Sequence, residues 1–462
     1  MKFARHHFSP VAARPARRRR AQTAAAALGL LALSLSPLRA QSAPPTGVPD
    51  TLDLKTAVTF ALQNNFAIRQ ARERIRQQEG VVVEVSAREI PNVSAAGSYQ
   101  ANDTSISQSA LPADRAWQIN VTASQVLFAG GGVRSAVKSS KLAREAAMLD
   151  LQETINDALL QVRTSFFAVI LAAEQIKVQE SNLELLQQQL KTATDRYDAG
   201  TVSSFEKLRA EVAVANAKVP LITARNNYRL AIESLRQALG FTTNTPDSLR
   251  KVPNFVGTLD FTPVNFDLQA AFDAAHANRP DLARLAKLSQ AREEGVTQAR
   301  STYFPSLSAF GGWQYRGARI RSVGSQSEDG WLAGVQGQWN IFDGRATAGR
   351  VTQARSAFEQ SKLALTEAQL AAEVEVRRAF SQWQQATELA EASKLVVGQA
   401  DEAVRLANAR YNAGTATQLD VLQAQTDLTT ARTNQIQAYY SYNVAVAALR
   451  KAMGQADEFV TH

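Results

Sequence analysis

The stretch Arg196-Tyr197-Asp198-Ala199-Gly200-Thr201 recurs 214 residues later as Arg410-Tyr411-Asn412-Ala413-Gly414-Thr415, with five of the six residues identical. Each stretch ends a long segment that is rich in Ala, Leu, Gln, Glu and Arg and contains no proline. A glycine directly after such a segment is typical of a helix end, where the backbone turns left-handed. We therefore expect two equivalent turns, each between two long helices.

Other landmarks keep the same offset of 214 residues, and chance does not hold one offset over a whole chain. The matched pairs are Leu52-Asp53-Leu54 with Phe266-Asp267-Leu268, Ile90-Pro91 with Phe304-Pro305, Trp117 with Trp331, Leu127-Phe128 with Ile341-Phe342, and Leu239-Gly240 with Met453-Gly454. We interpret the chain as an internal duplication of one structural unit. The predicted segments are a signal peptide at 1–40, an extended segment at 41–51, repeat 1 at 52–240, a linker at 241–265, repeat 2 at 266–454 and a tail at 455–462. Within the repeats we predict β-hairpins at 91–128 and 305–342 and long helical hairpins at 133–240 and 347–454.

The basic charge of the chain is concentrated in its first 40 residues. The formal net charge is +9, but residues 1–40 contain eight Lys and Arg and no acid, which leaves 43 basic against 42 acidic residues. This distribution speaks against nucleic-acid binding. A basic stretch, the apolar segment 24–35 and a small residue at Ala40 predict a cleaved export signal. A disordered basic tail is the alternative.

Several kinds of site are not expected. The sequence has no cysteine, so disulfides, thiolate metal sites and lipid-modified cysteines are excluded. No run of 18 or more consecutive apolar residues predicts a transmembrane helix. His276 is the one internal histidine, and it lies in no metal-ligand spacing. We expect neither an enzyme nor a bound cofactor or metal.

Each repeat predicts helices on both sides of a pair of strands. The longest helical segments, at 133–197 and 347–411, correspond to rods on the order of 100 Å. Each returning helix has only about 37 residues, so we expect it to stack end to end with the helix before the strands and so match the rod. Pro220 should bend the first returning helix.

The strands alternate apolar and polar side chains, and each strand is about 10 residues long, which suits a tilted strand across a bilayer. Aromatic side chains near the ends of the apolar faces suit the membrane interfaces. They are Tyr99, Trp117, Trp313, Trp331 and Trp339. The loops at 101–116 and 317–330 would then lie outside. Two half-buried hairpins packed on the helices are the alternative. Four strands cannot close a barrel, so a membrane role requires several subunits to share one.

The Leu-Phe-x-Gly that begins at Leu127 and the two Arg-Tyr-x-Ala-Gly-Thr turns resemble those of the TolC family of outer-membrane efflux and secretion proteins. The resemblance implies a mainly α-helical fold with a small transmembrane β portion. In a homotrimer, three chains would share a 12-stranded β-barrel in the outer-membrane lipid and a long α-helical coiled-coil barrel in the periplasm. It also implies a passive duct that works with a periplasmic membrane-fusion adaptor and an inner-membrane pump of RND or ABC type.

The resemblance further implies a periplasmic gate, formed by Tyr411, Asp420, Gln423 and Glu206. Gln423 stands where the family has a second acid, and Ala416 stands where it has a basic latch residue, which implies a weaker charged ring. Three copies of Asp420 around one axis would repel one another and bind cations. The turns themselves are the expected adaptor contacts, through Arg196, Tyr197, Gly200, Thr201, Arg410, Gly414 and Thr415.

The same residues also fit purely structural roles. Ser203 with Glu206, and Thr417 with Asp420, have the spacing of capping boxes. Arg196 and Arg410 complement the negative ends of the preceding helices. The proposed duct has two functional rivals: the duct of a type I protein secretion system, and a periplasmic coiled-coil adaptor or scaffold without a pore.

Overall fold

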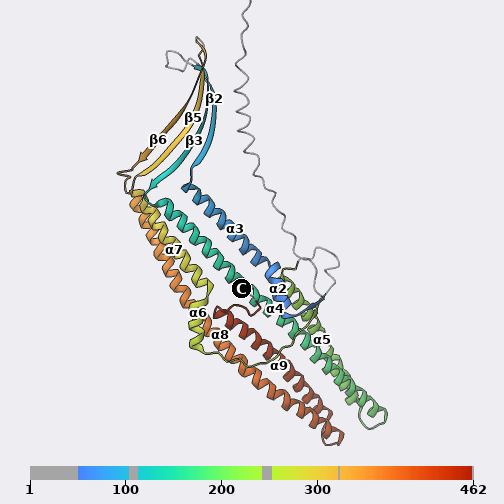
Figure 1. The fold of residues 1–462 in the computed structure, drawn as a ribbon. Coiled ribbons are helices and arrows are strands. Elements are labelled where there is room, and N and C mark those ends of the chain that lie inside the picture. The colour runs from blue at the N-terminus through green and yellow to red at the C-terminus, as the bar shows by residue number, and fades with distance from the viewer. Residues whose placement is uncertain (1–49, 104–112, 242–251, 321–322, 460–462) are drawn as a thin grey trace, which may run out of the picture. The chain divides into compact units, whose positions relative to one another are not determined.

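A computed structural model describes residues 50–103, 113–241, 252–320 and 323–459. The predicted signal peptide lies outside these residues. Repeat 1 contains α2 (Leu54–Asn64), α3 (Phe66–Ser86), β2 (Asn92–Ala101), β3 (Ala113–Ala129), α4 (Gly132–Asp198) and α5 (Ser204–Leu239). Repeat 2 contains α6 (Leu268–Asn278), α7 (Pro280–Arg300), β5 (Ser306–Ile320), β6 (Gly324–Gln338), α8 (Ala346–Asn412) and α9 (Gln418–Ala452) (Figure 1). The same order of elements in both halves confirms the duplication.

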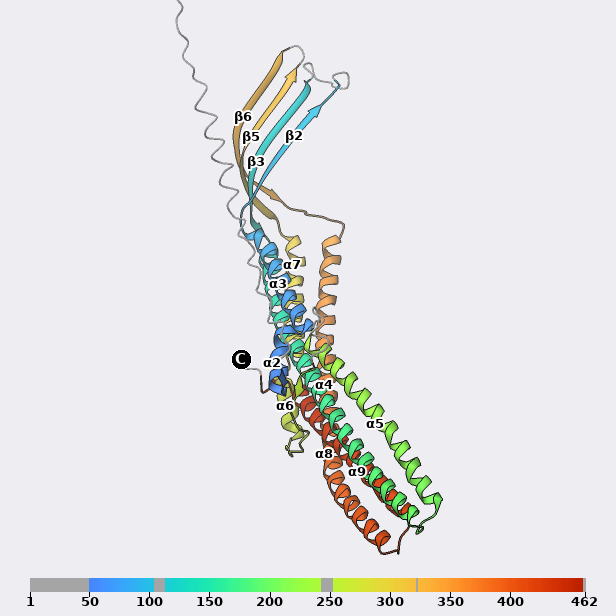
Figure 2. The ribbon, with the colours of Figure 1, turned by 90° about the vertical axis from the view of Figure 1, so that its right-hand side faces the viewer.

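The long helices α4 and α8 each have 67 residues, or about 100 Å. Helix α4 starts directly after β3 and ends at the turn Ala199–Ser203, so the sheet and the turn adjoin opposite ends of this helix (Figure 1). In the half near the turns, the helices lie side by side in the order α5, α4, α9, α8 (Figure 2). In the half near the sheet, the order is α3, α4, α7, α8. Helices α5 and α8 are therefore the outer members of one row.

The returning helices end against the helices that precede the strands, as predicted. Asn65, at the break between α2 and α3, donates a 2.7 Å hydrogen bond from Nδ2 to the carbonyl of Ala238 near the end of α5. Arg279 holds the equivalent position in repeat 2 and donates from Nη1 to the carbonyl of Ala452 over 3.2 Å. In each repeat the short and returning helices thus stack as one rod beside the long helix. Helix α5 continues through Pro220.

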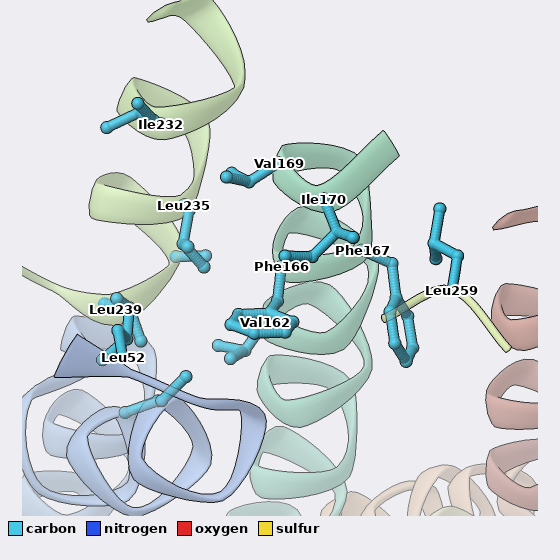
Figure 3. Close-up of a cluster of buried hydrophobic side chains, with 13 residues drawn as sticks. Leu52, Val162, Phe166, Phe167, Val169, Ile170, Ile232, Leu235, Leu239 and Leu259 are labelled. Carbon is cyan, nitrogen blue, oxygen red and sulfur yellow. The ribbon is translucent and has the colours of Figure 1, made fainter. Parts of the chain in front are cut away.

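The main hydrophobic core lies where α2, α4 and α5 meet (Figure 3). Phe166 on α4 is 1% exposed and is surrounded by Leu52 from β1 and by Leu235 and Leu239 from α5. The linker adds Leu259 to this cluster, and its short strand β4 (Asn254–Phe255) pairs in parallel with β1 (Thr51–Leu52). A second cluster around Trp383 and Leu449 holds the equivalent part of repeat 2.

The C-terminal tail crosses from repeat 2 to repeat 1. Arg163 on α4 donates two hydrogen bonds to Asp457, from Nε to Oδ2 at 2.6 Å and from Nη2 to Oδ1 at 2.9 Å. Its guanidinium also lies 5.1 Å from the centre of the Phe459 ring. The side chains of Arg163 and Asp457 are only 11% and 10% exposed. Burial alone would raise the pKa of Asp457. The hydrogen bonds from Arg163 and from the Phe459 N–H, together with the charges of Arg163 and Arg450, outweigh burial and lower this pKa.

The two hairpins form one antiparallel sheet in the order β2-β3-β5-β6, so the β3–β5 pairing joins the repeats. Odd-numbered residues share one face: Trp117 lies opposite Tyr99, and Trp313 lies opposite Trp331. The strands have 10, 17, 15 and 15 residues, so three of them exceed the expected length. The prediction of a loop at 317–330 is wrong, because β5 and β6 stay paired as far as Ile320 and Gly324. Cross-strand hydrogen bonds continue through polar residues there, and polarity alone does not end a strand.

One described helix, α4, has an 18-residue window apolar enough to cross a membrane by length and composition, with a mean hydropathy of 1.3. The expectation of no such helix rested on unbroken apolar runs, a stricter criterion. Of this window, 44% is buried against the rest of the chain, and α4 supplies Val162, Phe166 and Val169 to the core. A helix that packs in a hydrophobic core has the same apolar composition.

Candidate functional site

The two helical turns have the same hydrogen-bond geometry. Gly200 and Gly414 adopt φ of +71° and +73°, the left-handed backbone that favours glycine. Thr201 donates its N–H to the carbonyl of Arg196 over 2.9 Å, and its hydroxyl donates to the same oxygen over 2.9 Å. Thr415 repeats both bonds to Arg410, at 2.9 and 3.2 Å. Arginine, glycine and threonine of the motif therefore all have a defined role in ending the helix.

The start of α9 carries the predicted capping box. The Asp420 carboxylate accepts from the Thr417 N–H at 2.7 Å and from the Thr417 hydroxyl at 2.9 Å. The Asp420 N–H in turn donates to the Thr417 hydroxyl at 3.3 Å. The backbone N–H of Thr417, then its hydroxyl and the charge of Arg410, keep the pKa of the exposed Asp420 below its ordinary value. Asp420 therefore stays charged at neutral pH.

The prediction of a capping box at the start of α5 is wrong. Ser203 makes no side-chain capping bond, and the Glu206 N–H donates to the Ser203 carbonyl at 3.1 Å. Ser203 and Thr417 have similar extended backbones, with φ and ψ of −78° and 158° against −92° and 161°. The difference therefore lies in the side chains, which are Ser with Glu in the first turn and Thr with the shorter Asp in the second. Glu206 is half-buried and is not tied into a cap.

The two turns contact each other through Arg196 and Tyr411. The Arg196 guanidinium carbon lies 4.7 Å from the centre of the Tyr411 ring, and Nη2 donates to Asn412 Oδ1 over 3.4 Å. On the other side of the first turn, Lys207 Nζ lies 5.3 Å from the centre of the Tyr197 ring. A cation over an aromatic face is attracted by the ring quadrupole, so the ends of α4 and α8 are joined without an ion pair.

Within the described residues of one chain, the four predicted gate residues form no hydrogen bonds with one another, and three of them have other partners. Gln423 is exposed and donates from Nε2 to Asp427 over 2.9 Å. Asp420 is held by Thr417, and Tyr411 by Arg196. Across the described part of the chain, no hydrogen bond or ion pair joins any of them to Glu206. Any ring of these side chains requires other subunits.

Sequence reasoning missed four glutamines that line a cavity of about 230 Å³ next to Tyr411, between α4, α8 and α9: Gln188, Gln189, Gln418 and Gln425. Both amide atoms of Gln189 and the Oε1 atoms of Gln418 and Gln425 are buried without a hydrogen-bond partner. Such atoms are costly unless water reaches them, and this cavity has room for several water molecules. The detectable signal was a polar residue on the apolar stripe of α9, since Gln418 and Gln425 alternate with the buried Val421 and Leu428.

The aromatic side chains of the sheet lie mainly on its apolar face. Trp331 is 83% exposed, and Tyr99 and Trp313 are also exposed. The Trp117 indole lies across Gly317, where a Cβ atom would clash with it. Trp339 lies one residue beyond the end of β6 and donates from Nε1 to the Tyr303 carbonyl over 3.1 Å. Within the described ranges, no group of three or more His, Cys, Asp or Glu residues could hold a metal ion.

Comparison with known proteins agrees with this architecture. The chain is 25% identical over 414 residues to protein CyaE of Bordetella pertussis, covering 89% of this chain and 86% of that protein. It is 28% identical over 314 residues to the outer membrane protein TolC of Escherichia coli, covering 65% and 62% of the two chains. The CmeC outer membrane channel of Campylobacter jejuni has the same fold, with a TM-score of 0.75, 16% identity and coverage of 88% and 87%.

The family model described as outer membrane efflux protein matches residues 58–241 and 271–455, which are the two repeats. Members of this family are non-enzymatic channels of the outer membrane, which excludes the pore-free adaptor. Solved TolC-family structures imply a trimer that shares one barrel. With both repeats matched and the fold in agreement, the chain belongs to the outer membrane efflux protein family, the TolC family.

Proposed function

We propose that this outer-membrane channel is the exit duct of a tripartite efflux system, to which an inner-membrane pump and a periplasmic adaptor deliver substrate. The observation that carries the proposal is the pair of exposed turns at the ends of α4 and α8, far along these helices from the sheet. Their outer surfaces present Arg196, Tyr197, Thr201, Arg410 and Thr415 around Gly200 and Gly414. We assign this surface to the adaptor.

The outer surfaces of one chain support ring closure by a second copy. Strands β2 and β6 are the edges of the sheet, and each pairs with only one strand of its own chain. Helix α5 has an exposed apolar stripe at near-heptad spacing, and α8 has another. These residues are Phe205, Leu208, Val212, Val219, Ile222 and Leu230 on α5, and Leu363, Leu370, Val374, Leu389, Val396 and Leu406 on α8. Because the stripes lie on opposite ends of the row of helices, they suit a head-to-tail contact that closes a ring.

Within such a ring we assign the gate to Tyr411, Asp420, Gln423 and Glu206. Asp420 can cap α9 and still face the axis, because its carboxylate is exposed while it accepts the bonds from Thr417. Three negative charges around one axis favour bound cations. Glu206 lacks a capping bond and is free to contribute through a neighbouring subunit.

The channel is tested by the mass of the purified protein in detergent and by single-channel current in planar bilayers. A trimer with discrete current steps is expected, and a monomer that stays soluble without detergent contradicts the duct. For the gate, Asp420→Asn removes the charge and retains an oxygen that can accept from Thr417. We expect it to weaken block by divalent cations severalfold, and unchanged block removes Asp420 from the gate. Gln423→Glu should strengthen the same block.

The pump class is tested in cells that lack their own duct. Restored export of small molecules such as drugs, dyes or metals supports the proposed efflux role. Restored secretion of a protein by an ABC exporter, without small-molecule export, supports the rival type I secretion role. Both readouts use the full chain with its signal segment.

A further inference from the structure

Two arginines lie directly opposite each other on the central strands of the sheet. Arg115 on β3 is the register partner of Arg319 on β5, and both side chains are exposed. Side chains that face each other in an antiparallel pair have Cβ atoms about 4.5–5.5 Å apart. Because β3 and β5 are the inner strands, the pair lies within one chain and not at the sheet edges.

No described acid forms an ion pair with either arginine, although Asp114 precedes Arg115 in the sequence and its Oδ1 atom is buried without a hydrogen-bond partner. Like charges directly opposite each other destabilise a sheet, and no ion pair or hydrogen bond to an acid engages Arg115 or Arg319 in the described ranges. Arg316 points to the other face and is paired with Glu328 at 3.0 Å. Asp329 accepts from Trp313 Nε1 over 3.4 Å, and Asp103 already has an interaction partner. An anion from outside the chain would therefore stabilise the two arginines.

The position of the pair relative to the apolar face indicates which anion it meets. Arg115 and Arg319 share the odd-numbered face with Trp117, Tyr99 and Tyr315. Each lies two residues beyond the row in which the Trp117 indole covers Gly317. Interfacial tryptophans lie at the level of the lipid headgroups. Strand β3 continues from this row towards α4, so the arginines are at the end away from the helices, on the outer-leaflet side.

We propose that Arg115 and Arg319 together bind the phosphate group of a phosphorylated lipid headgroup in the outer leaflet. A guanidinium presents a planar fork of donors that matches phosphate oxygens, and two such forks from adjacent strands can hold one phosphate between them. The Trp117 indole supplies an apolar surface directly below for the rest of the lipid, which free phosphate lacks. This site rests on the outer-membrane placement and is independent of the pump, the adaptor and the gate.

The test compares the purified wild-type trimer with the Arg115→Gln/Arg319→Gln variant in native mass spectrometry. The probes are diphosphoryl lipid A, the same lipid with its phosphates removed, and inorganic phosphate. Wild type should retain the phosphorylated lipid and lose affinity when the phosphates are removed. The double variant should bind the phosphorylated lipid roughly 25-fold more weakly, on the basis of about fivefold for each basic residue near a membrane surface. Inorganic phosphate should not displace the lipid at equal concentration.

Arg316→Gln is the matched control, because it removes an arginine from the same strand on the opposite face. It should retain wild-type lipid affinity, and trimer mass shows that each variant has assembled. Equal affinity of the double variant and wild type overturns the proposal, as does an equal loss in the control. Full displacement by inorganic phosphate would assign the pair to a free anion. Channel conductance tests the proposed function separately, since the pair lies on the lipid-facing side.

Discussion

The Arg196 guanidinium at the end of α4 stacks on the Tyr411 ring at the end of α8, with 4.7 Å between the guanidinium carbon and the ring centre. These residues belong to different repeats, so the contact couples the two helical hairpins at their turns. The neighbouring seam between α4 and α9 contains the cavity lined by glutamines. At their turns the two hairpins are thus joined by an exposed cation–π contact and by a seam that contains buried polar atoms without hydrogen-bond partners.

Replacing Arg196 with alanine should make the open channel more frequent. An exposed cation–π contact contributes about 0.5–1 kcal/mol, which corresponds to a shift of roughly two- to fivefold in the closed-to-open ratio. The measurement is the open probability in planar bilayers. Arg196→Lys and Tyr411→Phe keep a cation and a ring, and both should stay near wild type. An unchanged open probability in Arg196→Ala would show that the contact does not hold the turns together.

Replacing Gln425 with leucine should strengthen the seam between the repeats. Its Oε1 atom is buried without a partner, and removing such an atom avoids a desolvation penalty of about 1–3 kcal/mol. We expect higher resistance to denaturant and a lower open probability. Gln437→Leu is the control, because Gln437 is exposed on the same helix, outside the proposed gate, and should change neither property. Lower stability in Gln425→Leu would mean that ordered water satisfies this oxygen better than an apolar side chain replaces it.

Gly240→Ala and Gly454→Ala should destabilise the protein more than Gly200→Ala. All three glycines have φ between +69° and +76°, which costs an L-residue about 1–2 kcal/mol. At Gly240 and Gly454 a Cβ atom would also overlap the backbone of Asn64 or Asn278, whereas nothing lies within 4 Å at Gly200. That overlap should add about 1–3 kcal/mol. Chemical denaturation of the detergent-solubilised trimer measures the difference, and equal losses at all three sites would contradict the predicted overlap.

Arg163→Leu should destabilise the protein by about 3 kcal/mol, because it leaves the carboxylate of Asp457 largely buried without its partner. Arg163→Leu/Asp457→Leu should recover part of the loss. Arg225→Leu removes an exposed arginine paired with Glu180 and should cost less than about 1 kcal/mol. Denaturant unfolding compares the three, and a similar loss in Arg225→Leu would show that burial of the tail pair does not matter.

The same pair predicts a dependence of stability on pH. The pKa of Asp457 is lower in the folded protein than in the unfolded chain, so its contribution is present above the unfolded pKa and is lost as pH falls through the folded value. Wild type should therefore lose more stability in acid than Asp457→Asn does. Parallel acid-unfolding curves for the two proteins would show that this carboxyl group does not titrate with unfolding.

The sequence alone determined the duplication, the four long helices, the strand pairs and the conformation of both glycine turns. These features depend on local patterns: proline-free helical segments, alternation of apolar side chains, and glycine where φ must be positive. The capping box at Thr417 and Asp420 was predicted on the same basis. Its counterpart at Ser203 and Glu206 was not formed although the backbone there is almost the same, so the side chains decide that bond.

Only the tertiary structure decided which distant residues meet. The register of β3 on β5 places Arg115 opposite Arg319, and the end of α5 meets Asn65 at the break after α2. The stacking of Arg196 on Tyr411 and the burial of three glutamines around one cavity also depend on how the repeats pack. Periodicity along one segment reports which face is apolar, but it carries no information about the segment that covers that face. For the contacts of Asn65 with Ala238 and of Arg163 with Asp457, that choice is made by packing between residues more than 150 positions apart in the sequence.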